Sequence, residues 1–171
     1  INLGNQIFWV CPLIEESNIL DYSSAKKKFD LLNKKFPGKV GLIHGALEKD
    51  KKEKILKEFL NKKIYILVST TVIEVGIDFP NANVIVIENA NKFGLAQLHQ
   101  LRGRVGRGKK QGTCILLFKE GLSKNAVKRI KILKKSDDGF FIAEEDLKLR
   151  GYGDLIGYQQ SGEKNFRFAD P

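Results

Sequence analysis

Five short apolar runs, separated by helix-length stretches, limit most strongly what this chain can fold into. Each run is four or five residues long, mostly β-branched or aromatic, and apolar at nearly every position, as in a strand covered on both faces. The runs span residues 7–11, 40–43, 64–68, 84–87 and 114–118. Because helix-length segments separate them, right-handed crossovers and a parallel sheet are expected. The pattern predicts an α/β fold, an open parallel sheet with helices on both faces.

Apolar stripes at helical spacing fill the intervals between these runs. The first stripe closes at Pro37-Gly38, which is a helix stop signal, and the second carries lysines on its opposite face. Their apolar members are Ala25, Phe29, Leu32 and Phe36, and then Ile55, Leu56, Phe59 and Leu60. After residue 120 the pattern changes to a basic helix over 123–135, a shorter amphipathic segment and an irregular glycine-containing loop. We therefore expect a sheet domain over 1–120, followed by a helical hairpin and loop over 121–171.

Composition excludes several classes of protein. The 171 residues contain no apolar run long enough to span a membrane and no secretory signal. Cys11 and Cys114 lie in apolar runs, which favours buried reduced thiols over a disulfide and a cytoplasmic location. The chain has no methionine and begins with Ile1, so we expect a piece of a longer protein.

Positive charge is concentrated in one part of the chain. Of the net charge of +10, +8 lies between residues 24 and 63, where 13 lysines face five acidic residues. Such an excess fits a solvated helix surface in a lysine-rich composition. It equally fits attraction to a polyanion such as DNA. Charge alone does not choose between them.

Polar residues follow several predicted strands, at the sheet edge where open α/β proteins bind ligands. His44 and Gly45 follow the second run, and Thr70 follows the third. The Thr70 hydroxyl is suited to donate to a phosphate, or to cap a helix. His44 is equally explained as a satisfied histidine at a strand end, and no partner spacing supports a metal site there.

Arginine is used sparingly, and half of it falls in one place. The chain has 24 lysines and six arginines, and three of the six lie within residues 102–107, in the string QLRGRVGRG. Guanidinium is a planar fork of donors that matches phosphate oxygens, and interspersed glycines permit close approach. One interpretation is a surface cluster at a helix C-terminus. The other is a pair of arginine fingers, Arg104 and Arg107, that reach a nucleoside triphosphate; they project on one side if this stretch is helical.

No phosphate-cradling sequence accompanies these arginines. The string G-x-x-x-x-G-K-[ST] is absent, and no acidic metal-holding pair follows a strand. Arginine fingers without a cradle place the cradle in another domain. The sequence thus argues against a complete stand-alone nucleoside triphosphatase, and we expect no metal site within the chain.

Two strings resemble known helicase motifs. Residues 66–90, ILVSTTVIEVGIDFPNANVIVIENA, and residues 93–108, FGLAQLHQLRGRVGRG, resemble motifs V and VI of superfamily 2 helicases. Residues 138–162, ending in QQSG, narrow the resemblance to the RecG family of ATP-dependent DNA helicases and its relative, the transcription-repair coupling factor. The wording VIEVGID and VIENA fits RecG better. The resemblance implies a second RecA-like motor domain followed by a translocation motif.

Functional roles follow from this resemblance, position by position. Arg104 and Arg107 match the arginines of motif VI that approach the γ-phosphate, and Gln100 matches the glutamine that opens that motif. Gly76 and Asp78 match motif V near the nucleotide ribose, although Asp78 is also placed to stabilise a turn. The other matched positions are His44, Gly45 and Thr70, which face the DNA backbone in related motors, and Arg150 and Gln160, which couple motor closure to DNA movement.

The function implied is that of the C-terminal motor domain of a double-stranded DNA translocase acting on forks and recombination junctions. ATP and Mg²⁺ would be held mainly by a first motor domain outside this chain, and the chain alone would be inactive. Branched and duplex DNA would be its partners, without a membrane. The alternatives are the equivalent domain of a coupling factor, and a basic nucleic-acid-binding module with no nucleotide role.

Overall fold

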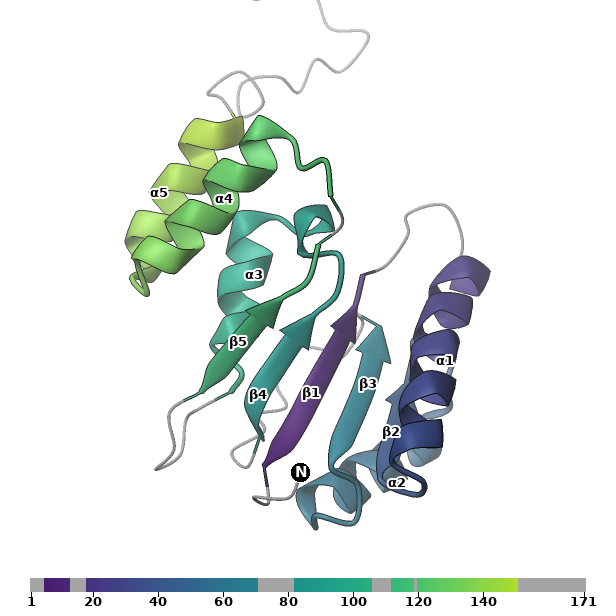
Figure 1. The fold of residues 1–171 in the computed structure, drawn as a ribbon. Coiled ribbons are helices and arrows are strands. Elements are labelled where there is room, and N and C mark those ends of the chain that lie inside the picture. Colours follow the sequence, from purple (N-terminus) through teal and green to yellow (C-terminus); the bar gives the residue numbers. More distant parts are fainter. Residues whose placement is uncertain (1–4, 13–17, 71–81, 106–111, 119, 151–171) are drawn as a thin grey trace, which may run out of the picture.

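A parallel sheet of five strands forms the centre of the chain. The computed structural model describes residues 5–12, 18–70, 82–105, 112–118 and 120–150. The strands are β1 (Gln6–Cys11), β2 (Val40–Ile43), β3 (Ile66–Thr70), β4 (Ala82–Ile87) and β5 (Thr113–Leu116), in the spatial order β2-β3-β1-β4-β5. All four pairings are parallel. The α/β class and the parallel sheet predicted from the sequence are therefore confirmed (Figure 1).

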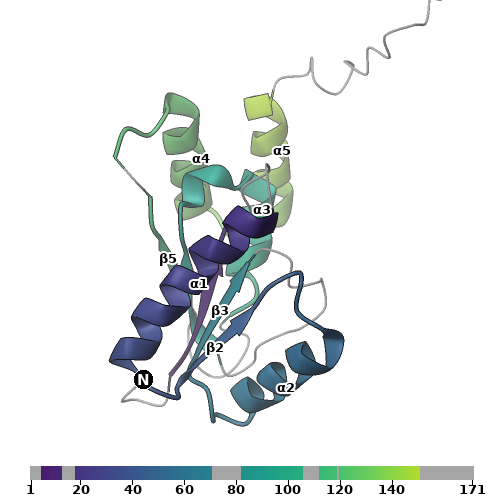
Figure 2. The same cartoon turned by 90° about the vertical axis from the view of Figure 1, so that its right-hand side faces the viewer.

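Two apolar clusters cover the two faces of this sheet because successive side chains of each strand point to opposite sides. In β1, Phe8 and Val10 join the larger cluster, whereas Cys11 joins the smaller one. The smaller cluster packs under α1 (Asn18–Lys35), and the larger one under α2 (Lys49–Leu60) and α3 (Leu95–Arg102). Figure 2 shows α1 and α2 on opposite sides of the sheet, as expected for helices on both faces.

The helical hairpin lies against α3 at one end of the molecule. It consists of α4 (Lys124–Lys135) and α5 (Gly139–Arg150), and Figure 1 places it on the far side of the sheet from α1. Ser123 caps α4 by accepting from the backbone N–H of Ala126 at 3.2 Å, which satisfies a donor at the first turn. Leu133 of α4 and Ile142 of α5 are buried in the larger cluster, so the hairpin shares its apolar core with the sheet.

Neither cysteine forms a disulfide. Cys11 is buried and Cys114 is half-buried, and both are free, as expected from the apolar runs that contain them. Within the described ranges, no helix is both long enough and apolar enough to cross a membrane.

Candidate functional site

The arginine stretch follows directly from α3. The helix is preceded by η1 (Ala90–Lys92), and Gln97 Oε1 accepts from the backbone N–H of Gly94 at 3.0 Å. Leu95 and Leu98 anchor α3 in the larger cluster, whereas Gln100 is exposed. The sequence thus gives α3 one buried face and leaves the predicted motif VI glutamine on its surface.

Arg104 lies beyond the end of α3. The helix ends at Arg102 and is capped by Gly103, and the backbone N–H of Arg104 donates to Leu101 O at 3.1 Å. The side chain of Arg104 is half-buried, and Val105 next to it is buried. Arg104 is therefore held in a turn and not on the helix, so the conditional argument that Arg104 and Arg107 share a helical face does not apply.

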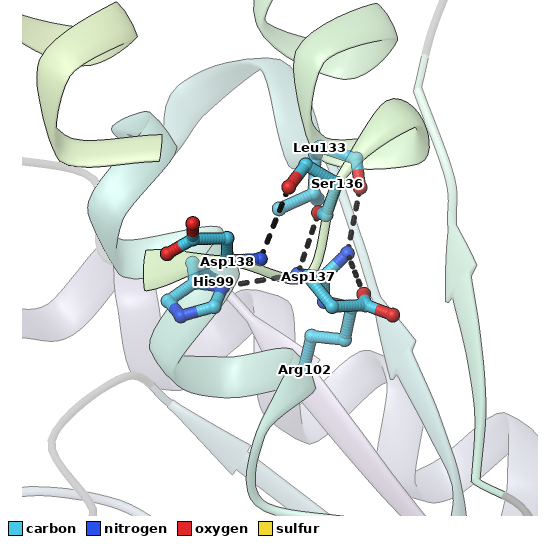
Figure 3. A network of polar contacts seen from close by, with 6 residues as sticks. All are labelled: His99, Arg102, Leu133, Ser136, Asp137 and Asp138. Atoms are coloured by element: carbon cyan, nitrogen blue, oxygen red, sulfur yellow. Dashed lines mark hydrogen bonds and ion pairs between the residues drawn. The ribbon is translucent and has the colours of Figure 1, made fainter. Parts of the chain in front are cut away.

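Arg102 points into the protein and ties α3 to the turn between α4 and α5. Its Nη1 donates to Leu133 O at 2.6 Å and pairs with Asp137 Oδ1 at 2.8 Å. Its Nη2 donates to Ser136 O at 3.0 Å and lies 3.0 Å from His99 Nδ1 (Figure 3). A planar guanidinium with several donors can satisfy this set of acceptors at once, which an ammonium on a flexible chain cannot. We call these five residues the α3–hairpin bracket.

The first residue of α5, Gly139, lies against the His99 ring of the bracket. A Cβ built on Gly139 would lie 3.2 Å from His99 Nε2, so the backbone of α5 approaches the histidine ring closely. His99 is thereby enclosed between Arg102 and the first residue of α5. Only glycine fits there without a shift of the ring.

A second arginine braces the same interface. Arg129 of α4 donates from Nη1 to Phe93 O at 2.9 Å, in the segment that leads into α3. The sequence pattern placed Arg102 in the arginine cluster without indicating a role for it, and it gave Arg129 no role either. The signal in the sequence that could have found both residues is the use of arginine in a chain that otherwise prefers lysine. The guanidinium groups of Arg102 and Arg129 each donate to a backbone carbonyl of another element.

Residues predicted to face DNA lie at the carboxyl edge of the sheet. His44 follows β2 and is half-buried; burial, and then the charge of Lys52, lower its pKa below the usual value. Lys52 Nζ also donates to Gly45 O at 3.1 Å. Thr70, the last residue of β3, is 2% exposed, and its carbonyl accepts from the Ser69 hydroxyl at 2.6 Å. His44 and Gly45 thus lie together at the surface, whereas the geometry of Thr70 suits a structural role, and its phosphate contact stays a prediction.

Four predicted site residues lie outside the described residues. These are Arg107, Gly76, Asp78 and Gln160. Arg150 is the last residue of α5, and nothing is described of its side chain. Their assigned roles remain predictions from the resemblance.

A polar cluster at the end of β4 was not predicted. Glu88 follows the strand, and its Oε2 accepts from Trp9 Nε1 at 3.2 Å and lies 3.5 Å from Cys11 Sγ. Lys28 Nζ pairs with Glu88 Oε1 at 2.9 Å and lies 5.0 Å from the centroid of the Trp9 ring. Burial, and then the negative charge of Glu88, raise the pKa of Cys11 to about 12. The cluster joins α1 to the carboxyl ends of β1 and β4. The raised pKa keeps the Cys11 thiol protonated at neutral pH.

The described ranges hold no cluster of metal-ligating side chains. No three of their His, Cys, Asp or Glu residues gather into a group that could hold a metal ion. Arg104 presents guanidinium chemistry, which suits a phosphate oxygen. A role for Arg104 toward a triphosphate stays a prediction from the resemblance.

Comparison with known protein families identifies the family to which this chain belongs. Residues 3–109 match the family described as helicase conserved C-terminal domain, and the chain belongs to that family. Residues 136–169 match the C-terminal part of domain 3 of the ATP-dependent DNA helicase RecG. The resemblance to RecG found in the motifs is thereby confirmed, and it includes the hairpin turn that Arg102 holds.

Individual relatives agree over nearly the whole chain. The ATP-dependent DNA helicase RecG of Escherichia coli K12 is 47% identical over 171 residues, and that of Bacillus subtilis is 48% identical over 169 residues. These alignments cover 99% and 98% of this chain but only 25% of each relative. The chain thus spans about a quarter of the length of these helicases.

Solved structures give the same fold. The structure of RecG bound to a three-way DNA junction matches 90% of this chain and 20% of that chain, with a TM-score of 0.73 and 47% identity. The Mycobacterium smegmatis helicase Lhr matches with a TM-score of 0.58 at 16% identity, which supports the fold alone. The expected RecA-like helicase architecture is confirmed.

Proposed function

We propose that this chain is the second motor domain of an ATP-dependent translocase that moves double-stranded and branched DNA, with regression and branch migration of forks and junctions as its outcome. ATP is bound in a cleft between this domain and a first motor domain of the same protein. Support comes from the identity to RecG helicases and from the junction-bound RecG structure that shares this fold.

The arginine stretch completes the nucleotide site from this side of the cleft. Arg104 and Arg107 approach the terminal phosphate and stabilise the charge that develops on it, and Gln100, which is exposed on α3, contributes to the same site. Mg²⁺, when bound with ATP, neutralises phosphate charge. Gly76 and Asp78 line the ribose, and His44, Gly45 and Thr70 face the DNA backbone.

One observation carries the proposal. Arg104 lies two residues beyond Arg102, and Arg102 is bonded to the α4–α5 turn. A displacement of the arginine stretch on nucleotide binding therefore moves the hairpin that leads to Arg150 and Gln160. In this way the ATP cycle is coupled to movement of DNA.

The test compares two variants of the full-length protein. Arg104→Ala should lower ATP turnover by about 10³–10⁵, while duplex binding stays nearly unchanged. Lys92→Ala, an exposed cation of η1, is the matched control and should leave turnover intact. Near-normal turnover in Arg104→Ala would remove this residue from the nucleotide site. In addition, the isolated 171-residue chain should hydrolyse no ATP, and DNA-stimulated turnover by it would refute the two-domain site.

A further inference from the structure

Helix α4 carries a row of lysines along its outermost side. Spacings of four, three and four place them on one face of the helix, and all are exposed. The row consists of Lys124, Lys128, Lys131 and Lys135, and we call it the lysine ridge. Ala126 and Leu133, which are buried, lie on the opposite side of α4. The ridge therefore lies on the side of α4 opposite its buried residues.

The ridge differs from the other lysine-bearing helices. Helix α1 pairs Lys28 with Glu88, and α5 pairs Lys148 with Glu144 and Glu145. Glu48, at the start of α2, pairs with Lys51. Helix α4 contains no acidic residue, and along the described stretches its lysines form no ion pair.

This arrangement works against the helix itself. Like charges three and four residues apart repel, and Lys124 lies in the first turn, where the helix dipole disfavours a cation. A surface that is merely solvated gains nothing from this alignment. A polyanion laid along the ridge would relieve the repulsion, because its negative charges would then neighbour every lysine.

We propose that the lysine ridge of α4 binds the phosphate backbone of duplex DNA, as a contact separate from the carboxyl edge of the sheet. The ridge is about 16 Å long, since eleven steps of about 1.5 Å separate Lys124 from Lys135. A duplex carries one negative charge per about 1.7 Å of its axis when both strands are counted, so about ten charges lie along that length, and some of them face the ridge. The straight ridge matches this dense, regular array.

The chemistry of α4 favours a duplex over a single strand. Proteins that hold single strands combine cations with aromatic side chains on which bases stack. The sequence of α4, KNAVKRIKILKK, has no aromatic residue. Lysine alone reads phosphates without reading bases, so the contact holds DNA without regard to sequence.

The position of α4 gives this contact a use. Arg102 bonds to Leu133 O, and Arg129 of α4 bonds to Phe93 O in the segment before α3. DNA on the ridge is thus fixed to the same unit as the arginine stretch. The choice of DNA as partner rests on the proposed function, and the ridge adds to it a grip on the duplex that moves with α3.

The experiment measures duplex binding by the full-length protein between about 50 and 200 mM salt. The logarithm of the association constant falls linearly with the logarithm of the salt concentration, and each lost phosphate contact reduces the magnitude of this slope by about 0.9. The ridge variant changes Lys124, Lys128 and Lys131 to Gln; it spares Lys135, whose ammonium also contacts the Phe141 ring. The control changes Lys34, Lys35 and Lys57 to Gln, which are exposed and close to the C-terminal ends of α1 and α2. Both variants lose the same charge.

The ridge variant should lower the slope by about 2 to 3 and weaken duplex binding at least tenfold, whereas the control should match the wild type. Changing the same three lysines to Arg should restore the slope. Circular dichroism should show an intact fold, because the substitutions remove repulsion. A slope equal to that of the control overturns the proposal, and so does an equal loss for single-stranded DNA. DNA-stimulated ATP turnover by the wild type is scored separately: its absence refutes the proposed function whatever the slope.

Discussion

The Arg102 guanidinium donates to the main-chain carbonyl of Leu133 at 2.6 Å, which joins the last residue of α3 to the end of α4. Covalently these residues are 31 positions apart. The same side chain also donates to Ser136 O and pairs with Asp137, so one guanidinium joins the end of α3 to the turn between α4 and α5.

Replacing Arg102 by Ala should destabilise the chain by about 1–3 kcal/mol, because the carbonyls of Leu133 and Ser136 lose their charged donor. Arg102→Lys should recover less than half of this loss, since one ammonium cannot reach all the acceptors. Urea unfolding measures both, with Lys131→Ala as an exposed control. A loss below about 0.5 kcal/mol for Arg102→Ala would mean that the bracket contributes little to stability.

Gly103→Ala should separate folding from function. A Cβ at Gly103 would meet nothing closer than 3.6 Å, so stability should change by less than about 0.5 kcal/mol. If the arginine stretch packs closely against another domain, ATP turnover by the full-length protein should nevertheless fall. Gly41→Ala is the contrasting variant, because its Cβ would lie 2.9 Å from Ile55 Cγ2; about 1–3 kcal/mol of stability should be lost. Normal turnover in Gly103→Ala would argue against a close approach at this turn.

The ion pair between Lys28 and Glu88 should be worth more than the surface pair between Lys26 and Asp30. The first pair is 23% exposed on each side, and its partners also contact Trp9, whereas the second is 40% and 50% exposed. Double-mutant cycles should give about 1 kcal/mol or more for the first pair and at most about 0.5 kcal/mol for the second. Equal coupling energies would show that the cluster at the end of β4 gains nothing from its partial burial.

Alkaline pH should destabilise the fold through Cys11. Its pKa is raised from 9.0 to about 12, so between these values the unfolded chain loses a proton that the folded chain keeps. Stability is complete below pH 9 and declines as pH rises toward 12. Near pH 10 this thiol alone should contribute a slope of about −1.2 kcal/mol per pH unit in the free energy of unfolding. Urea unfolding from pH 8 to 10.5 should be flatter for Cys11→Ala, and identical slopes would contradict the assignment.

Local patterns in the sequence were sufficient to locate the strands and the hairpin. The expectation that every strand is covered on both faces is wrong for β5, where Ile115 is 41% exposed. The apolar runs at 7–11 and 40–43 are β1 and β2 almost to the residue, and the predicted helix at 123–135 is α4 with its cap. The apolar side of α4 is less sharply marked by the sequence, because Val127 is apolar and follows buried Ala126, yet it is 36% exposed. The spacing of apolar residues fixes the angular position of the buried face of a helix only to about one residue, or about 100°.

Contacts distant in sequence were beyond such reasoning. The order of the strands is not encoded in any one segment, and neither is the direction in which a guanidinium points. Arg102 and Arg104 lie in the same arginine-rich string, and nothing in that string shows that Arg102 turns inward to Leu133 while Arg104 follows in a turn after the helix ends. The cluster around Glu88 likewise depends on β1 and β4 lying side by side, 77 residues apart at Ile7 and Val84.

The central position of β1 has a consequence for how the polypeptide is made. Ile7 pairs with Ile66 on one side and Val84 on the other, so this hydrophobic strand leaves the ribosome long before either neighbour exists. At about 5–20 residues per second, several seconds of translation separate β1 from β3. Throughout that interval the hydrogen-bonding groups on both edges of this segment have no native strand to pair with, so its correct pairing must wait until β3 and β4 have been synthesised.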